Sequence, residues 1–205
     1  MKKIAVLASG TGTNFQAVID GCESKKIDGK VVLLIYNRKD AYAKQRADEF
    51  GIPSIYINRI AEGSVEAMQK RVNDELIKHQ ADIIVLAGYL EKLSMQVVEN
   101  WENRIINTHP SLIPMFCGKG YYGQNVHKAV IENGVKVSGC TIHLVDANYD
   151  TGPIIMQHPV EVHQDDTPES LAKRILPYEH DCLVKSVSLL CEDRIYVKNG
   201  RAYII

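Results

Sequence analysis

Residues 4–14, IAVLASGTGTN, join a short apolar run to a loop with two glycines, and a helical pattern follows. The apolar run at residues 4–8 predicts a buried β-strand, since strands covered on both faces are almost free of polar residues. A helix is expected at residues 14–26. A glycine turn between a strand and a helix is typical of the first unit of an α/β sheet, where ligands bind at the carboxyl ends of the strands.

The same alternation continues through the first half of the chain. Strands are predicted at 31–36, 54–57, 83–87 and 104–108, and helices at 41–50, 64–79 and 94–100. The helix at 64–79 has the clearest pattern, with Val65, Met68, Val72 and Leu76 at helical spacing on one face. This order predicts a doubly wound, mostly parallel sheet, that is, a Rossmann-like α/β fold.

The second half changes character after a loop at 110–123 that is rich in glycine and proline. A short helix is expected at 125–132, and β-rich stretches at 137–145 and 154–162 can pair as antiparallel strands. Thr167 is a good N-cap for a helix that runs toward Leu190, with a kink at Pro177. Residues 195–205 contain Asn199-Gly200 between two β-rich runs, which predicts a hairpin. We therefore predict one domain, 1–205, with a nucleotide-binding half at 1–109 and an antiparallel extension within 110–205.

Composition and charge exclude several classes of protein. Lys and Arg number 24 against 25 Asp and Glu, so neither nucleic acid nor a membrane surface is expected as a partner. The five cysteines are odd in number and form no CxxC pair, which favours free thiols over disulfides or a zinc site. The first apolar run is too short for a signal peptide or a membrane span. A cytoplasmic protein that acts on small molecules is expected.

The loop at residues 9–14 has two interpretations. It can be a tight turn that Thr13 or Asn14 caps. It can also cradle a phosphate, because the free N–H groups of Gly12, Thr13 and Asn14 would meet the positive end of the helix dipole. Its place after a parallel strand favours the phosphate.

The kind of phosphate follows from what the loop lacks. Phe15 occupies the third glycine position of the dinucleotide pattern GxGxxG, and the second strand ends in Asn37-Arg38 without an acidic residue for a ribose. No Walker A sequence occurs. A monophosphate is therefore favoured over a dinucleotide or ATP, and a nicotinamide oxidoreductase is the weaker alternative.

Two further clusters carry polar side chains. Asn107 and His109 stand two apart at the end of a predicted strand, so they can face the same side, and Pro110 turns the chain away. The stretch 146–153, DANYDTGP, is a polar segment that is commonly only a turn. A His beside an Asn at a strand end, next to a flexible loop, favours a catalytic site.

Taken in order, four motifs resemble a known family. They are SGTGTN at 9–14, LAGY at 86–89, NTHPSLIP at 107–114 and HLVDANYDTGPII at 143–155. Together they resemble the glycinamide ribonucleotide formyltransferases of the folate-dependent formyltransferase superfamily, over nearly the whole chain. The superfamily's tRNA enzyme has an added C-terminal domain and its usual bacterial hydrolase an added N-terminal one, so 205 residues favour the ribonucleotide enzyme.

The resemblance implies transfer of a formyl group from 10-formyltetrahydrofolate to the amine of glycinamide ribonucleotide, in purine biosynthesis and without a metal. Asn107, His109 and Asp150 are the implied catalytic set. Asn107 would donate to the tetrahedral oxyanion. His109 would carry protons, and the Asp150 carboxylate would raise the pKa of His109.

The resemblance also implies the binding residues. The ribonucleotide phosphate is expected at Gly12, Thr13 and Asn14, and its glycyl amine at Glu179. The implied folate-binding residues are Leu90, Glu91, Lys92, Leu93, Asn107 and Asp146. By the same resemblance, 110–205 is expected to be the folate-site half of the domain.

The sequence departs from the family at two positions and in the loop at 116–122, FCGKGYY, where the commoner form has a Pro before its Gly. It also leaves two other functions open. Relatives often carry Arg where this chain has Glu91 and a basic residue where it has Val65, which bears on the folate tail. A formyltetrahydrofolate hydrolase would use the same three catalytic residues, with water in place of the amine. A nucleotide-binding module that kept the fold and lost the chemistry is the non-enzymatic alternative.

Overall fold

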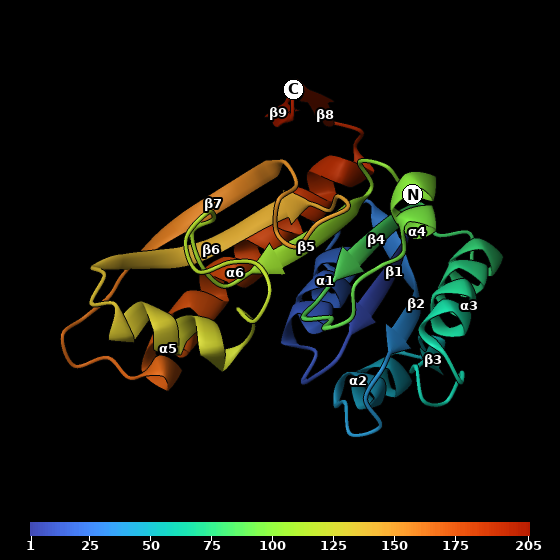
Figure 1. Ribbon diagram of the computed structural model, residues 1–205. Coiled ribbons are helices and arrows are strands. Elements are labelled where there is room, and N and C mark those ends of the chain that lie inside the picture. Colours follow the sequence, from blue (N-terminus) through green and yellow to red (C-terminus); the bar gives the residue numbers. More distant parts are fainter.

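A seven-stranded sheet forms the centre of the protein, in the order β3-β2-β1-β4-β5-β6-β7. The computed structural model describes residues 1–205 (Figure 1). The strands are β1 (Lys2–Ala8), β2 (Gly29–Tyr36), β3 (Ser54–Tyr56), β4 (Ile83–Leu86), β5 (Ile105–His109), β6 (Val137–Leu144), β7 (Ile154–Glu161), β8 (Ile195–Lys198) and β9 (Arg201–Ile204). The helices are α1 (Thr13–Glu23), α2 (Ala43–Glu49), α3 (Val65–Lys78), α4 (Met95–Asn100), α5 (Gln124–Glu132) and α6 (Pro168–Cys191).

One strand, β6, runs opposite to the other six strands of the sheet. β1 pairs in parallel with β2 and β4, and the parallel pairing continues to β3 on one side and β5 on the other. β6 pairs antiparallel with both β5 and β7. The predicted mostly parallel α/β sheet with an antiparallel extension is therefore confirmed, as is the terminal hairpin of β8 and β9.

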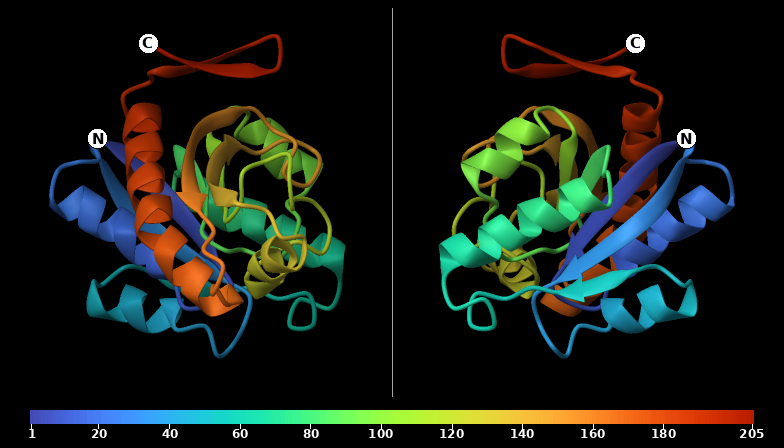
Figure 2. Two further views of the ribbon diagram at one scale, coloured as in Figure 1. Left: turned by 90° about the vertical axis from the view of Figure 1, so that its left-hand side faces the viewer. Right: turned by 90° about the vertical axis from the view of Figure 1, so that its right-hand side faces the viewer.

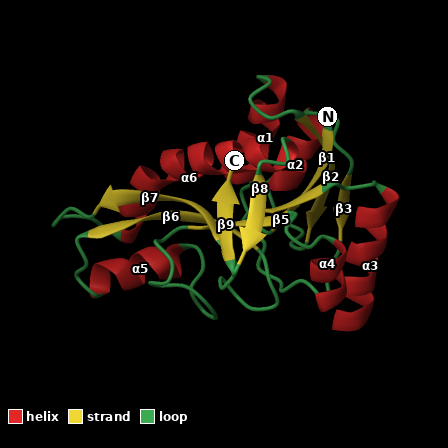
Figure 3. Ribbon diagram, turned by 90° about the horizontal axis from the view of Figure 1, so that it is seen from above, coloured by secondary structure: helices red, strands yellow, loops and turns green.

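Helices cover both faces of the sheet. Alternate residues of β1 point to opposite sides, so Ile4 and Val6 enter a core under α1 and α6, while Ala5 and Leu7 enter a second core under α3 and α4. Figure 3 shows α1 and α6 on one side of the strands and α3 and α4 on the other. All four residues of β4 are buried, which explains its unbroken apolar sequence.

The helix boundaries refine the expected ones. α1 begins at Thr13 rather than residue 14 and ends at Glu23. Thr167 caps α6 through a hydrogen bond from the Ser170 N–H, as expected, and α6 then continues through Pro177 as one helix. Val65 was expected on the apolar face of α3, but it is half exposed because it is the first residue of the helix, and the buried face begins at Met68.

The β8–β9 hairpin follows α6 and stands apart from the main sheet (Figure 2). The rings of Tyr196 and Tyr203 stack across the hairpin with their centroids 5.2 Å apart. Such cross-strand aromatic pairs stabilise a two-stranded ribbon. None of the helices combines the length and the apolar character that a membrane crossing would need.

Candidate active site

A cavity of about 1000 Å³ opens at the carboxyl ends of β1, β4 and β5. Every binding or catalytic residue predicted from the sequence lines it except Gly12, which is buried beneath the loop. The other eleven are Thr13, Asn14, Leu90, Glu91, Lys92, Leu93, Asn107, His109, Asp146, Asp150 and Glu179. Five separate segments of the chain thus meet at one place. Three of them follow β1, follow β4 or form the end of β5, and the carboxyl ends of these parallel strands share one edge of the sheet. The loop with Asp146 and Asp150 follows the antiparallel strand β6, and Glu179 lies on α6.

The orientation of Asn107 is fixed by a residue on the neighbouring strand. Asn107 of β5 lies opposite His143 of β6, and the amide Nδ2 is 3.0 Å from His143 Nε2. His143 Nδ1 is 2.8 Å from the Leu144 carbonyl oxygen, which only accepts, so this nitrogen carries the hydrogen. His143 Nε2 is then the acceptor. The Asn107 amide donates to it, and also to Asp150 Oδ1 over a longer 3.4 Å.

His109 is buried between a carbonyl and a carboxylate. Its Nε2 is 2.8 Å from the Phe116 carbonyl oxygen and must donate to it, while Nδ1 lies 3.7 Å from Asp150 Oδ2. Burial lowers the pKa of His109 below 6.5, and this outweighs the opposite effect of Asp150. The expected rise in the pKa was therefore wrong in its net direction. His109 is neutral at pH 7, with an unprotonated Nδ1 facing Asp150.

Asp150 stands at the centre of these groups. Its backbone has a φ of +56°, which is uncommon outside glycine and typical of sites where the fold holds one side chain in place. Oδ2 accepts from the Gly118 N–H at 2.8 Å. Burial by itself would raise the pKa of the carboxyl, but His143, the Gly118 N–H and His109 together hold it below 3.8. Asp150 is therefore ionised at neutral pH.

The loop before α1 leaves the first helical N–H groups without a side-chain cap. The N-cap is Gly12, with a φ of +71° and no side chain to accept from the helix. The expectation that Thr13 or Asn14 caps the turn was therefore wrong. Arg46 Nε donates to the Thr11 carbonyl at 2.9 Å and holds the loop from outside the cavity. Uncapped N–H groups at a helix start form a site for an anion.

Glu179 joins three elements at the floor of the cavity. Its Oε1 accepts from Asn14 Nδ2 of α1 at 2.8 Å and from Thr108 Oγ1 of β5 at 2.7 Å. Burial raises the pKa of this carboxyl. The Oδ1 atom of Asn14 is buried and has no partner in the protein. Since unpartnered buried polar atoms are rare in folded proteins, these groups indicate a polar ligand.

The opposite side of the cavity is formed by the loops after β4 and β6. The Leu90 N–H donates to Ser9 Oγ at 2.9 Å, which ties the β4 loop to the end of β1. The Lys92 amine lies 5.6 Å from the centre of the Tyr149 ring, so the two loops also touch. Lys92 and Leu90 are exposed, whereas Leu93 is largely buried in the core.

Asp146 lies in the loop after β6, and its carboxylate already accepts hydrogen bonds from other residues of that loop. Oδ1 accepts from the Asn148 N–H at 2.9 Å and from Thr151 Oγ1 at 2.8 Å. Its side chain therefore fixes the conformation of the loop, and the backbone of the loop is left to face the cavity.

Among the lining residues that were not predicted are two histidines, His143 and His127. A signal for His143 is present in the sequence, because it alternates with Thr141 on a strand whose pairing with Asn107 then brings it to the site. His127 lies on the buried face of α5 and its sequence pattern is that of a core residue. No group of three or more His, Cys, Asp or Glu side chains is arranged to hold a metal ion.

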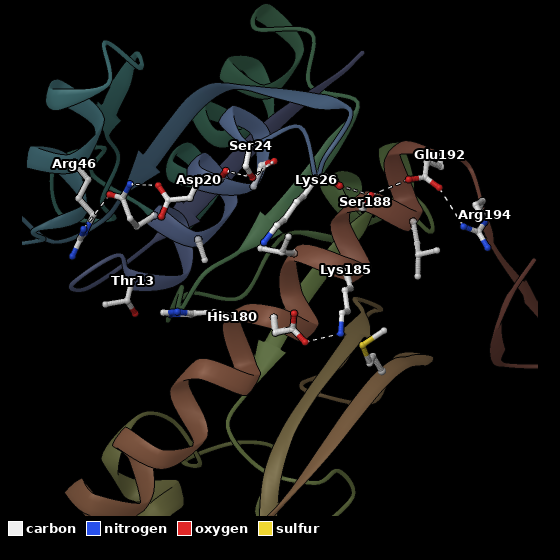
Figure 4. Close-up of a pocket in the computed structure, with 17 residues that line it drawn as sticks. Thr13, Asp20, Ser24, Lys26, Arg46, His180, Lys185, Ser188, Glu192 and Arg194 are labelled. Atoms are coloured by element: carbon white, nitrogen blue, oxygen red, sulfur yellow. Dashed lines mark hydrogen bonds and ion pairs between the residues drawn. The ribbon is translucent and has the colours of Figure 1, made fainter.

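A second groove, of about 930 Å³, lies between α1 and α6 (Figure 4). Several of its charged side chains pair with one another, Lys185 with Asp181 at 2.7 Å and Arg194 with Glu192 at 3.3 Å. It shares only Thr13 with the larger cavity and contains none of the catalytic candidates. The larger cavity is therefore the candidate active site.

Known proteins resemble this chain in both sequence and fold. Residues 2–187 match the family described as Formyl transferase. A chloroplastic phosphoribosylglycinamide formyltransferase of Arabidopsis thaliana is 43% identical over 95% of this chain and 67% of its own length. The crystal structure of glycinamide ribonucleotide transformylase 1 from Symbiobacterium toebii has a TM-score of 0.94 and 38% identity, covering 100% of this chain and 94% of that one. A formyltetrahydrofolate deformylase from Pseudomonas syringae has a TM-score of 0.89 and 25% identity, and this chain covers 66% of it.

Proposed function

Since this chain belongs to the formyl transferase family, we propose that it transfers a formyl group from 10-formyltetrahydrofolate to the amine of glycinamide ribonucleotide, a step of purine biosynthesis. The observation that carries the proposal is that Asn107, His109 and Asp150 meet in the cavity that also contains the uncapped start of α1. Two small-molecule substrates fit a space of about 1000 Å³.

The ribonucleotide occupies the side of the cavity near α1. Its phosphate binds the free N–H groups at Thr13 and Asn14, where the helix dipole favours an anion. Its glycyl amine lies by Glu179, whose hydrogen bonds from Asn14 and Thr108 both go to Oε1 and leave Oε2 for the substrate. The pterin of the folate lies on the other side, between the loops after β4 and β6.

Formyl transfer makes one bond and breaks another. The amine attacks the formyl carbon to form a C–N bond, and the carbonyl oxygen becomes an oxyanion. Asn107 stabilises that charge with the Nδ2 hydrogen that makes only a 3.4 Å contact to Asp150. His143 holds the rest of the amide in place. Because the donor is oriented before the reaction, it costs little reorganisation at the transition state.

His109 and Asp150 move the proton that the reaction displaces. The attacking amine loses one proton, and His109 Nδ1 accepts it because this nitrogen is unprotonated in the free protein. The resulting imidazolium is stabilised by Asp150, 3.7 Å away. The proton then goes to the folate nitrogen as its bond to the formyl carbon breaks. One proton is taken up and one returned, so the transfer is balanced.

Hydrolysis of the formyl-folate is the second candidate function, since water can attack in place of the amine. The buried carboxylate of Glu179 and the uncapped N–H groups favour the amine substrate, because water requires neither. Both groups lie on the ribonucleotide side of the cavity.

The proposal is tested by the rate of folate release with and without glycinamide ribonucleotide. We expect turnover to depend on the ribonucleotide. In Asn107→Ala the loss should fall on kcat, by about 10²–10³, since the oxyanion exists only along the reaction path. Folate release at the same rate without the ribonucleotide would favour hydrolysis. An effect of Asn107→Ala on KM alone would contradict its role.

A further inference from the structure

His127 is a buried histidine in the cavity to which the mechanism gives no role. It lies on α5 with 5% of its surface exposed and lines the cavity with the catalytic residues. Neither of its ring nitrogens has a hydrogen-bond partner in the protein, and because Nδ1 is fully enclosed, Nε2 is the nitrogen that the cavity can reach. A buried polar atom without a partner costs stability unless a ligand supplies one.

The position of His127 assigns it to one of the two substrates. α5 packs beside the N-terminal half of α6 (Figure 1), and Lys173 and Glu179 of α6 line the same part of the cavity. The loops that are expected to hold the pterin, after β4 and β6, form a different wall. His127 therefore faces the ribonucleotide side.

The charge of His127 limits which part of the ribonucleotide it can meet. Burial, helped by the nearby His109, lowers the pKa of His127 to about 4. A neutral imidazole has one donor and one acceptor, as a hydroxyl group does. The phosphate has other partners, because the start of α1 and the cationic Arg38 and Lys173 lie in the same cavity. The neutral groups of the ribonucleotide are its amide and the hydroxyls of the ribose. The amide belongs to the glycyl end, which the proposed function places at Glu179 and the reacting carbon, so the hydroxyls are the groups assigned to His127.

We propose that His127 hydrogen-bonds a ribose hydroxyl of the substrate through Nε2 and thereby selects a ribosyl phosphate. This inference rests on the proposed function. With the phosphate held at Thr13 and the amine at Glu179, the ribose that joins them lies against the wall that α5 contributes. His127 acts there on binding and takes no part in proton transfer.

The test compares glycinamide ribonucleotide with its 2′-deoxy and 3′-deoxy analogues by direct titration. Wild type should bind the ribonucleotide about tenfold more tightly than one of the analogues, the ordinary effect of one buried hydrogen bond. His127→Phe keeps the ring shape without its nitrogens. It should bind the ribonucleotide about tenfold more weakly and that deoxy analogue as wild type does. The KM for formyl-folate should not change.

Three further variants separate hydrogen bonding from packing. His127→Gln keeps a polar group near Nε2 and should recover much of the discrimination, while Val130→Ala loosens the packing of α5 and leaves His127 unchanged. His180→Phe is a matched control, since the His180 Nε2 atom is also buried without a partner but lies in the other groove (Figure 4). Both controls should keep the wild-type preference between ribose and deoxyribose.

The results that would overturn the inference are specific. If His127→Phe discriminates as wild type does, or weakens the ribonucleotide and both analogues equally, the ring has only a packing role. If His127→Phe fails to fold, His127→Gln must show the recovered preference beside a His127→Ala that has lost it. Wild type that binds none of these ribonucleotides would contradict the proposed function itself, whereas binding without discrimination would contradict only the role of His127.

Discussion

Replacing Gly12 by alanine tests whether the loop before α1 is built for a phosphate. Gly12 has a φ of +71°, in the left-handed region that favours glycine. A Cβ added there would lie 2.8 Å from Ala43 Cβ and 2.9 Å from Ala43 Cα. Real Cβ atoms do not approach other carbons so closely. Gly12→Ala must therefore shift α2 or the loop, and the N–H groups at the start of α1 move with it.

The size of the effect follows from two contributions. A non-glycine residue in the left-handed region costs about 1–2 kcal/mol. Forcing a methyl group against the Ala43 backbone adds about 1–3 kcal/mol, as in other overpacked sites. We expect Gly12→Ala to lose about 2–5 kcal/mol of unfolding free energy and to bind glycinamide ribonucleotide much more weakly.

Gly10 provides the matched control in the same loop. It is exposed, a Cβ there would meet nothing within 4 Å, and its φ is not positive. Gly10→Ala should change the unfolding free energy by no more than about 0.5 kcal/mol. Urea unfolding and ribonucleotide titration of both variants measure the two effects. A Gly12→Ala protein that is as stable as Gly10→Ala and binds the ribonucleotide normally would refute the phosphate site at this loop.

Three other substitutions test the site. Asp150→Asn should lower kcat/KM by about 10²–10⁴. The acidic limb of its pH profile should also move to lower pH, because the Asp150 carboxylate raises the pKa of His109 in the wild type. Near-normal turnover of the folded variant would remove Asp150 from the mechanism. Glu179 has a raised pKa when folded, so its contribution to stability is full below the unfolded pKa and is lost as pH rises through the folded value. As pH rises from acidic to neutral, Glu179→Gln should therefore lose less unfolding free energy than wild type. It should also bind the ribonucleotide more weakly. If the pH dependence of urea unfolding is the same in both proteins, the buried, raised-pKa state of Glu179 is contradicted. Glu91→Arg should tighten formyl-folate binding by less than about tenfold, since a charge contact at the solvent edge is worth about 0–1 kcal/mol. Added salt should shrink this gain in affinity. A large change in affinity that salt does not affect would place the Glu91 side chain inside the pterin pocket.

Local sequence patterns were enough to predict the sheet and its helices. The four buried residues of β4 and the helical spacing of Met68, Val72 and Leu76 depend only on which faces are covered. Parallel strands that end at one edge account for the candidate residues after β1, after β4 and on β5. Asp146, Asp150 and Glu179 were implied only by the family resemblance, since they follow the antiparallel strand β6 or lie on α6. The roles assigned to these residues stay proposals.

What the sequence could not show depends on contacts between distant segments. The part played by His143 requires the register in which β6 pairs with β5. The pKa of His109 fell rather than rose because the depth of burial outweighs one neighbouring charge, and burial is a property of the whole fold. The start of α1 is uncapped because its N-cap is Gly12, and Asn14 in the first turn donates to Glu179 on a helix far along the chain.

The central claim is that the formyl group goes to an amine of a ribonucleotide, and the fate of a labelled formyl group tests it most directly. The protein is mixed with 10-formyltetrahydrofolate carrying ¹³C in the formyl group, with and without glycinamide ribonucleotide, and the labelled products are separated by mass spectrometry. We predict that the label appears in N-formylglycinamide ribonucleotide and that little is released when the ribonucleotide is absent. Label released as formate at the same rate in both mixtures would contradict formyl transfer and favour hydrolysis.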